Sequence, residues 1–526
     1  MDSNIILRDW VNRNARRFPD KEAVICDSVR ITFAEFRDRV NRLANTLIDQ
    51  KGFGKGDRIA ILSDNCPTYF ELYFGIAQAG MISVPLNYRL SSLEVSELIS
   101  HSGAKLVFVG PNQVSLLKES PIDIDTVVLD VSDKDKFVFY DDFVKGYAYD
   151  EPQVKIKDDD LAVLCYTSGT TGMPKGVMAS HRNLVANAIN QQSEISTQPE
   201  DLVLTGFPMF HIISAIMMTD FARGCSQIFY NFTPEKTLEL ISVEKPTVLW
   251  LPTSALHFTV IHPKVSEYDL SSVRRISTGA GPLMESTLMK TFELFGSHLD
   301  YFLHTFAQTE ACPILSALYV RGPLSASTLD VSEAEREKLF SSGREVYNVE
   351  LNVFDENDRP LPARTIGEIV ARGRNVMEGY WKDPETTAQA LRGGWLHTGD
   401  LGYMDEDNFI YLVDRKKDMI ISGNENIYSK EVEDVLSIHP AVMDVAVIGV
   451  PDDTWGEVVK AIVVLKPGMQ VSEQEVIDHC KKRIASYKKP KSVDFWNEPL
   501  PRTPSGKVVK YSLREQYWKD HKKKIQ

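Results

Sequence analysis

A loop rich in hydroxyl groups and glycine runs from Tyr166 to Val177 and reads Tyr-Thr-Ser-Gly-Thr-Thr-Gly-Met-Pro-Lys-Gly-Val. It follows an apolar run that begins at Leu161, as a loop at the end of a buried strand does. Its backbone N–H groups and hydroxyls can surround a single anion, and Lys175 adds positive charge. Its glycines let the backbone approach a polyphosphate closely because they carry no Cβ. The loop therefore predicts a phosphate site.

The same loop differs from a Walker loop, because no Gly-Lys-Ser/Thr ends it and Pro174 prevents an immediate helix. A polar turn between two strands is the simpler interpretation of a Ser/Thr/Gly loop in general. The order of the residues here is more specific than their composition.

Further short motifs follow in the chain, and each of them alone is a weak signal. One motif ends in a glutamate, one ends in a lysine, one contains an aspartate and one contains two glycines. They are Ser277–Pro282, Thr305–Glu310, Trp395–Gly402 and Leu500–Lys507. A charged segment, Leu412–Ser422, lies between the last two.

Taken together and in this order, these motifs resemble those of the acyl-adenylate-forming enzymes, a family that includes acyl-CoA synthetases, adenylation domains of peptide synthetases and beetle luciferases. The resemblance covers almost the whole chain. It implies an AMP-forming acid–CoA ligase that uses ATP, Mg²⁺ and coenzyme A. The implied cofactor-binding residues are Thr167, Ser168, Gly169, Thr170, Thr171, Gly172, Lys175, Gly279, Ala280, Gly281, Thr305, Phe306, Ala307, Gln308, Thr309, Asp400, Arg415, Lys417, Gly423 and Asn424.

The implied catalytic residues are Lys507, Glu310, Thr167 and His211. Lys507 would bridge the substrate carboxylate and the α-phosphate during adenylation. Glu310, with Thr167, would hold Mg²⁺, since magnesium prefers one or two carboxylates together with substrate phosphates.

Around the nucleoside, Phe306 would pack on the adenine and Asp400 would accept hydrogen bonds from both ribose hydroxyls. Arg415 would reach the ribose or the phosphates, and Lys417 would occupy the hinge between two domains. Ala307 stands where glycine is usual in the family.

The implied acyl pocket contains His211, Ile212, Ala215, Thr253 and Ala280. A lone histidine among apolar residues is usually a core residue, but the surrounding Pro-Met-Phe-His match favours a pocket role. Ala215 replaces the tryptophan gate seen in some long-chain enzymes. These residues favour a medium-sized fatty, alicyclic or aromatic acid.

The loop expected to hold the pantetheine arm, Ser422–Ile427, departs from the family pattern. Asn424 replaces a second glycine, and asparagine tolerates left-handed backbone better than most residues. Lys488, Lys489 and Lys491 would meet the phosphates of coenzyme A or simply be solvated.

Composition restricts the remaining interpretations. The chain has 526 residues and a net charge of −14, which argues against nucleic acid as a partner. No apolar run approaches the roughly 18 residues that span a bilayer, so no integral membrane segment is expected. One of the longest runs, Ile212–Met218, is interrupted by Thr219-Asp220. The sequence leaves open a homodimer.

Cysteine usage and the N-terminus point to the cytoplasm. Six cysteines are scattered, without a C-x-x-C pair or a Cys/His cluster, as in reduced cytoplasmic proteins. Residues Met1–Trp10 include an early acid and no cleavable apolar segment, which argues against a signal peptide.

The elements that must position these motifs alternate between helix and strand before about residue 343. The segment Thr32–Leu47 has a helical apolar face with a Thr32/Glu35 capping box. Apolar runs predict buried strands at Lys55–Leu62, Thr126–Leu129, Leu202–Thr205, Pro246–Leu251 and Val273–Thr278. Such alternation favours mainly parallel sheets covered by helices.

Beyond about Gly343 short strands and tight turns predominate, with hairpin loops at Asp355–Asp358 and Asp405–Asn408. A helix from Lys430 and a strand at Val445–Val450 then suit a small α+β module. The predicted fold is α/β, with a large N-terminal domain of mainly parallel sheets plus a small β-barrel subdomain at 1–415. A mobile α+β C-terminal domain is predicted at 416–526.

Three other functions share parts of the pattern. A carrier-protein-loading adenylation enzyme would need a pantetheinylated carrier supplied in trans, since no carrier module follows Lys507. A luciferase-like oxygenase would share every nucleotide motif but shows a different pocket pattern near His211. A non-catalytic nucleotide sensor would be expected to have lost Lys507, Glu310 or Asp400, and all three are present.

Overall fold

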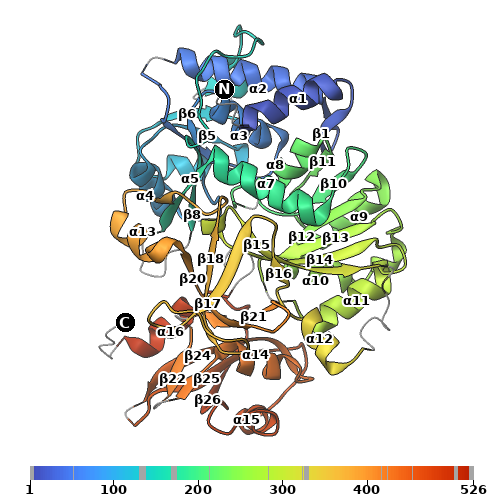
Figure 1. Ribbon diagram of the computed structural model, residues 1–526, viewed down its shortest axis with the longest axis vertical. Coiled ribbons are helices and arrows are strands. Elements are labelled where there is room, and N and C mark those ends of the chain that lie inside the picture. Colours follow the sequence, from blue (N-terminus) through green and yellow to red (C-terminus); the bar gives the residue numbers. More distant parts are fainter. Residues whose placement is uncertain are drawn as a thin grey trace. The chain divides into compact units, whose positions relative to one another are not determined.

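The computed structural model (Figure 1) describes residues 5–50, 52–129, 138–167, 174–212, 214–281, 283–322, 324, 331–415, 418–422, 425–452, 454–502 and 508–519. The chain forms two compact units, one of Met1–Leu351 with Ala371–Leu396 and one of Asn352–Val370 with His397–Gln526. The boundary predicted at 415/416 follows the motifs and stays a prediction.

The first unit contains two large sheets, and the described residues of the first sheet form nine strands. Their order is β16 (Arg344–Glu345), β15 (Ile314–Arg321), β14 (Tyr301–Ala307), β13 (Arg275–Gly279), β12 (Val248–Pro252), β10 (Leu202–Thr205), β11 (Ser226–Phe229), β1 (Glu22–Cys26) and β2 (Val29–Thr32). The six strands from β14 to β1 are parallel to their neighbours, and β15, β16 and β2 are antiparallel at the edges.

The second sheet has eight strands in the described part of the chain. Their order is β19 (Gly379–Tyr380), β9 (Lys175–Ser180), β8 (Leu161–Thr167), β4 (Ile82–Pro85), β3 (Arg58–Leu62), β5 (Ala104–Val109), β6 (Asp125–Val128) and β7 (Val138–Phe139). Only β9 and β19 run antiparallel to their neighbours. The predicted α/β class with mainly parallel sheets is confirmed, because the alternating apolar strands are buried as such sheets require.

Helices cover both sheets, and their starts follow local sequence signals. Helix α2 (Phe33–Asp49) begins at the predicted capping box: the Thr32 hydroxyl accepts from the Glu35 N–H at 3.2 Å, and the Glu35 carboxylate accepts from the Thr32 N–H at 2.8 Å. The other helices of this unit are α1 (Leu7–Arg17), α3 (Pro67–Gln78), α4 (Ser92–Ser102), α5 (Val114–Lys118), α6 (Tyr140–Phe143), α7 (His181–Ile195), α8 (Ser214–Arg223), α9 (Pro234–Glu244), α10 (Thr253–Val260), α11 (Glu285–Phe295), α12 (Glu333–Leu339) and α13 (Pro384–Ala390).

An aromatic cluster forms the core where α2, α3 and α8 meet strand β11. The rings of Phe36, Phe70, Phe74, Phe221 and Phe229 are fully buried, or nearly so, and their neighbouring centroids lie 4.9 to 5.7 Å apart. Tilted and edge-on pairs at this spacing add to the free energy gained by burying the rings. The cluster therefore ties the helices of the N-terminal residues to the first sheet.

The region predicted to form a small β-barrel contains a four-stranded sheet in the order β17 (Val349–Phe354), β18 (Gly367–Gly373), β20 (Leu396–Met404) and β21 (Ile410–Arg415). Strands β20 and β21 are antiparallel and joined by the predicted hairpin loop at Asp405–Asn408.

The second unit ends in an α+β module, as predicted. Its sheet has the order β23 (Glu425–Ile427), β22 (Ile420–Ser422), β25 (Gly456–Leu465) and β24 (Val442–Asp452), with β26 (Ser492–Trp496) also paired to β25. Alternate residues of β24 face opposite cores, with Val447 packing beside α14 (Ser429–Ser437) and α15 (Glu473–Lys481), and Ile448 beside α16 (Lys510–Trp518).

Among the helices that the structure describes, none combines the length and the apolar character needed to cross a membrane.

Candidate active site

Four of the predicted site residues lie at or just beyond the carboxyl ends of parallel strands in the first sheet. His211 follows β10, Thr253 follows β12, Gly279 ends β13, and Glu310 follows β14. In open parallel sheets ligands bind in the crevice beyond these strand ends. The topology thus brings segments that are far apart in the sequence to one edge of one sheet.

The glycine loop after β13 approaches β14 more closely than any other residue type would allow. Gly279 pairs with Thr305, and a Cβ added at Gly279 would lie 2.4 Å from the Thr305 hydroxyl oxygen and 2.8 Å from the Thr305 carbonyl oxygen. Glycine is required here by space, because a side chain would displace the neighbouring backbone.

Ala280, next in the loop, has a left-handed backbone with φ of 67°. Such a conformation costs about 1 kcal/mol or more for a residue with a Cβ and persists only where neighbours fix it. The Thr253 hydroxyl donates to the carbonyls of Gly279 and Gly281 at 3.0 and 3.1 Å, and the His304 Nε2–H donates to the Gly281 carbonyl at 3.2 Å. Thr253, predicted to line the acyl pocket, thus uses its hydroxyl to hold this loop.

The phosphate loop joins two antiparallel strands. Thr167 ends β8, Lys175 begins β9, and the two residues are register partners, with the Thr167 hydroxyl 3.5 Å from the Lys175 carbonyl oxygen. A strand therefore follows the loop where a Walker loop has a helix. Ser168, Gly169, Thr170, Thr171 and Gly172 lie outside the described residues.

Glu310 carries a nearly buried carboxylate, since the residue is 9% exposed. Its Oε1 accepts a hydrogen bond from the Tyr380 hydroxyl at 2.9 Å. Burial and then the carboxylate itself raise the pKa of Tyr380, so this hydroxyl stays protonated and donates. Within the described ranges no basic side chain forms an ion pair with Glu310, although Lys175 Nζ lies 5.1 Å from the centroid of the Tyr380 ring.

This environment fits a bound magnesium ion. A buried carboxylate without a basic partner is costly unless a cation compensates its charge. The described residues contain no cluster of three or more His, Cys, Asp or Glu side chains suited to a metal. One carboxylate is enough for Mg²⁺ when substrate phosphates supply the other ligands.

The neighbouring Cys165 thiol on β8 is buried and unreactive. Burial raises its pKa to about 12, and the negative charge of Glu310 adds to the shift. A thiol with so high a pKa carries no thiolate at neutral pH, so Cys165 is not a nucleophile.

The predicted acyl-pocket segment between β10 and α8 is held by buried hydrogen bonds. Asn65 donates to the Phe207 carbonyl at 2.8 Å and accepts from the Met209 N–H at 2.7 Å, and the Tyr73 hydroxyl donates to the Met209 carbonyl at 2.6 Å. His211 is half-buried at the end of this segment, while Ile212 and Ala215 are 2% and 3% exposed. Asn65 and Tyr73 thus hold the backbone that leads to the predicted pocket residues.

In the second unit Asp400 and Arg415 are register partners on β20 and β21. The Arg415 Nε lies 3.1 Å from Asp400 Oδ1, and the Asp400 N–H donates to the Thr398 hydroxyl oxygen at 3.1 Å. The two predicted nucleoside-binding residues are therefore brought together. They form an ion pair in which the Asp400 residue is 7% exposed.

Four predicted residues of this unit, Lys417, Gly423, Asn424 and Lys507, lie outside the described residues. The residues on either side of the segment with Lys507 are held in place. Arg502 and Val508 form a β-bridge, and Arg502 pairs with Asp444 at 2.6 Å. Lys510 pairs with Glu433 at 2.7 Å, and both side chains are largely buried. Lys488, considered for coenzyme A, pairs with Glu431 at 2.7 Å.

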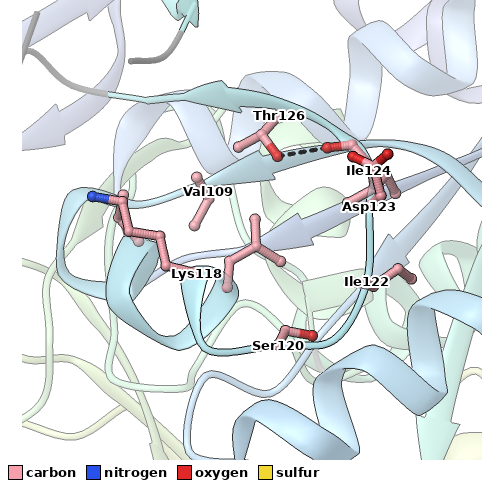
Figure 2. Close-up of a pocket in the computed structure, with 9 residues that line it drawn as sticks. Val109, Lys118, Ser120, Ile122, Asp123, Ile124 and Thr126 are labelled. Atoms are coloured by element: carbon pink, nitrogen blue, oxygen red, sulfur yellow. Dashed lines mark hydrogen bonds between the residues drawn. The ribbon is translucent and has the colours of Figure 1, made fainter. Parts of the chain in front are cut away.

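A small cavity of the first unit lies apart from these motifs (Figure 2). Its volume is about 190 Å³, and its lining residues are Val109, Val114, Leu117, Lys118, Ser120, Ile122, Asp123, Ile124 and Thr126. Sites for small organic ligands usually have volumes of about 300 to 1,000 Å³. It holds none of the predicted site residues, and within it the Thr126 hydroxyl donates to the Ile124 carbonyl at 3.0 Å.

Comparison with known proteins agrees with this arrangement. The AMP-binding enzyme family matches residues 11–381, and the AMP-binding enzyme C-terminal domain matches residues 431–507. The chain belongs to the AMP-binding enzyme family. The predicted resemblance is confirmed, and with it the predicted class, an ATP-dependent acid–CoA ligase.

Relatives of this AMP-binding enzyme are similar over nearly their full lengths. A feruloyl-CoA synthase from Amycolatopsis is 35% identical, with 97% of this chain and 99% of the relative covered. A long-chain-fatty-acid–CoA ligase from Mycobacterium tuberculosis is 35% identical, with 93% of each chain covered. The structure of ATP-bound MatB from Rhodopseudomonas palustris superimposes with a TM-score of 0.84 at 28% identity, covering 98% of this chain and 99% of that one.

Two residues of the site were missed from the sequence. His304 lies one residue before the Thr305 motif and looks like an ordinary strand residue. Tyr380 belongs to a two-residue strand that pairs with β9, about 200 residues earlier in the chain. Its only local signal is the preceding Gly379, whose φ of 141° marks a backbone that few other residues adopt.

Proposed function

We propose that this AMP-binding enzyme activates its acid in two half-reactions. The substrate carboxylate attacks the α-phosphorus of ATP in line, which forms an acyl-adenylate and expels pyrophosphate. The thiol of coenzyme A then attacks the acyl carbon, and AMP leaves. The observation that carries this proposal is the buried Glu310 carboxylate, which has no basic partner in the described residues and lies beside the strand that leaves the phosphate loop.

The residues of the first unit divide the work of the first half-reaction. Thr167 and Lys175 fix the two ends of the phosphate loop, and Lys175 adds positive charge for the phosphates. The loop after β13, which Thr253 and His304 hold, offers a fixed backbone wall to the adenine. Glu310, with Thr167, would hold Mg²⁺, which supplies neutralisation of phosphate charge when it is bound.

The second unit supplies the remaining roles in this proposal. Asp400 accepts hydrogen bonds from the ribose hydroxyls, and Arg415 orients that carboxylate through their ion pair. Lys507 neutralises the charge that grows at the α-phosphate, a role that rests on its motif. The module that carries Lys507 turns about Lys417 between the half-reactions, and the loop with Gly423 and Asn424 then receives the pantetheine arm.

For the acid we propose a medium-sized fatty, alicyclic or aromatic carboxylate. The buried Ile212 and Ala215 give an apolar pocket wall, with the half-buried His211 as its polar group. The two relatives described above are named for ferulate and for long-chain fatty acids, so membership of the family does not decide the acid. All six cysteines are free thiols, in keeping with the cytoplasmic location that we propose. A homodimer stays a hypothesis for sedimentation analysis.

The test is a panel of acids graded in length and ring content. Purified enzyme with ATP and Mg²⁺ should release pyrophosphate with its preferred acid and form AMP stoichiometrically once coenzyme A is added. The same panel with a pantetheinylated carrier protein, and separately with luciferin and a light detector, checks the two rival functions. Failure of every acid to release AMP would contradict the proposal.

Lys507→Ala separates the half-reactions. The adenylation rate should fall by about 100-fold or more, because the charge that this lysine neutralises exists only in that step. Thioester formation from a synthetic acyl-adenylate should change far less. An equal loss in both steps would show that Lys507 acts on folding or on the movement of the module instead.

A further inference from the structure

Tyr380 interacts with both the Glu310 carboxylate and the amine of Lys175. Its hydroxyl donates to Glu310 Oε1 at 2.9 Å, and Lys175 Nζ lies 5.1 Å from its ring centroid. Tyr380 thus interacts with a cation proposed for the phosphates and with an anion suited to a metal. A direct ion pair between Lys175 and Glu310 would cancel both charges.

The backbone around Tyr380 is held firmly in this place. Tyr380 pairs with Val177, and the Trp381 N–H donates to the Gly176 carbonyl at 2.7 Å. The Tyr380 N–H donates to the Thr387 hydroxyl oxygen at 2.8 Å. Tyr380 itself is 7% exposed. The backbone of Tyr380 is therefore held both by β9 and by Thr387 of α13.

The same segment also fixes the backbone of Glu310. The Met377 N–H donates to the Glu310 carbonyl at 2.8 Å. The Asn375 amide donates to the carbonyls of Ala311 and Ile314 at 2.7 and 3.0 Å. Residues 375–381 therefore form a strap that joins the Glu310 turn to the strand leaving the phosphate loop.

We propose that Tyr380 is a positioning residue for the metal-binding carboxylate of Glu310. Its neutral hydroxyl fixes the orientation of the carboxylate without compensating its charge, and its ring gives the Lys175 amine a contact other than an ion pair with the carboxylate. A basic residue at this position would orient Glu310 equally well but would neutralise it. This inference rests on the proposed role of Glu310, which it extends to a residue that no motif marks.

The test uses Tyr380→Phe, which keeps the ring and removes only the hydroxyl. The readout is the dissociation constant of Mn²⁺, a spectroscopic substitute for Mg²⁺, measured by electron paramagnetic resonance with a non-hydrolysable ATP analogue. We expect affinity to weaken about tenfold, the effect of losing one hydrogen bond to a charged group. The Mg²⁺ concentration for half-maximal pyrophosphate release should rise by the same factor, while thioester formation from a synthetic acyl-adenylate stays unchanged.

Tyr411→Phe is the matched control. The Tyr411 hydroxyl donates to Asp405 Oδ2 at 3.0 Å, and the residue is 8% exposed, so the same bond is lost at the same burial. Its Mn²⁺ affinity should equal that of the wild type. Weakening in both variants, or in neither, would overturn the inference.

Glu310→Gln completes a double-mutant cycle. If Tyr380 acts through the Glu310 carboxylate, Tyr380→Phe should cause no further loss of Mn²⁺ affinity in the Glu310→Gln background. Additive losses would overturn the inference. The activity of the wild type distinguishes a failure of the proposed adenylation from a failure of the role of Tyr380. If the wild type adenylates its acid but Tyr380→Phe leaves the Mn²⁺ affinity unchanged, only the role of Tyr380 is refuted.

Discussion

Two nearly buried carboxylates, one in each unit, differ in what compensates their charge. Glu310 is 9% exposed and accepts from a neutral tyrosine hydroxyl, whereas Asp400 is 7% exposed and pairs with the Arg415 guanidinium at 3.1 Å. A carboxylate that keeps its charge uncompensated can attract a cation strongly. A carboxylate that is already paired can still accept hydrogen bonds from neutral hydroxyl groups. The surroundings of the two acids therefore match metal binding for Glu310 and ribose binding for Asp400.

Removing the charge of Glu310 is the strongest way to break this comparison. Glu310→Gln keeps the shape and the hydrogen bond to Tyr380 but offers no anion to a metal. We expect kcat for adenylation to fall about 10³-fold, or ~4 kcal/mol, because metal neutralisation of phosphate charge contributes several kcal/mol to such steps. Pyrophosphate release measures the loss.

The matched control is Glu244→Gln, which removes a carboxylate paired with Arg30 at 2.7 Å in the same unit. An exposed pair of this kind contributes about 1 kcal/mol or less to stability, and we expect adenylation to stay near the wild-type rate. A comparable loss in both variants would mean that charge at Glu310 has no special role.

A third acid, Asp220 on α8, sharpens the comparison because it is fully buried and has no basic partner among the residues that the structure describes. Burial, with a smaller contribution from Asp201, raises its pKa to about 7. The Thr197 hydroxyl donates to its Oδ1 at 2.9 Å, and no basic group pairs with it in the described residues. Asp220 avoids burying a charge because it keeps its proton. If Glu310 kept its proton in the same way, it would offer no negative charge to a metal ion.

Asp220 makes stability depend on pH with a definite sign. Between its unfolded pKa of about 4 and its folded pKa, the native state binds the extra proton, so stability falls as pH rises through this window. In addition to burial, the charge of Asp201 raises the pKa of Asp220, and the charge of Arg275 lowers it. Burial, and then the Asp220 carboxylate in turn, raise the pKa of the Cys225 thiol. Asp220→Asn removes the titration, and we expect it to gain about 2 kcal/mol relative to the wild type between pH 5 and pH 8.

Thermal unfolding of both proteins at these two pH values measures that gain. Phe221→Leu, a neighbouring core change without a titrating group, is the control and should lower Tm equally at both values. Parallel shifts with pH for the wild type and Asp220→Asn would show that Asp220 is ionised throughout the range.

The sequence predicted what local pattern determines and missed what tertiary pairing determines. The capping box at Thr32 and the buried strands could be predicted because burial and helix starts depend on neighbouring residues. The sequence shows that the apolar run Ile212–Met218 ends at Thr219-Asp220, but it does not reveal that α8 continues to Arg223 with Asp220 buried. That burial depends on Thr197, 23 residues earlier in the chain, whose hydroxyl supplies the hydrogen bond that a buried carboxyl group requires.

The residues of the candidate site also fall into those that a local motif predicts and those that only tertiary pairing brings to the site. Motifs at Glu310, Asp400 and Lys175 are recognisable because their residue types stand in a fixed local order. Tyr380 reaches Glu310 only because β19 pairs with β9, and no local signal reveals that pairing. Likewise the brace from Thr253 to the loop around Ala280 depends on two strand ends meeting at one sheet edge.

Asp400→Asn gives the smallest expected effect and tests the compensated half of the comparison. The variant keeps one acceptor oxygen and removes the charge that pairs with Arg415, whose side chain is 41% exposed. Loss of a charged acceptor for ribose hydroxyls should raise KM for ATP about tenfold, near 1.5 kcal/mol. It should leave kcat almost unchanged, since the ribose is bound equally in the ground and transition states.

Deoxyribose nucleotides provide the decisive control for that experiment. With 2′-deoxy-ATP or 3′-deoxy-ATP the wild type should lose part of its affinity, and Asp400→Asn should lose little more, because the bond is already gone. If Asp400→Asn instead lowered kcat as Glu310→Gln does, the ion pair with Arg415 would not set the role of this acid. The contrast between the two carboxylates would then come from position alone, and charge compensation would not explain it.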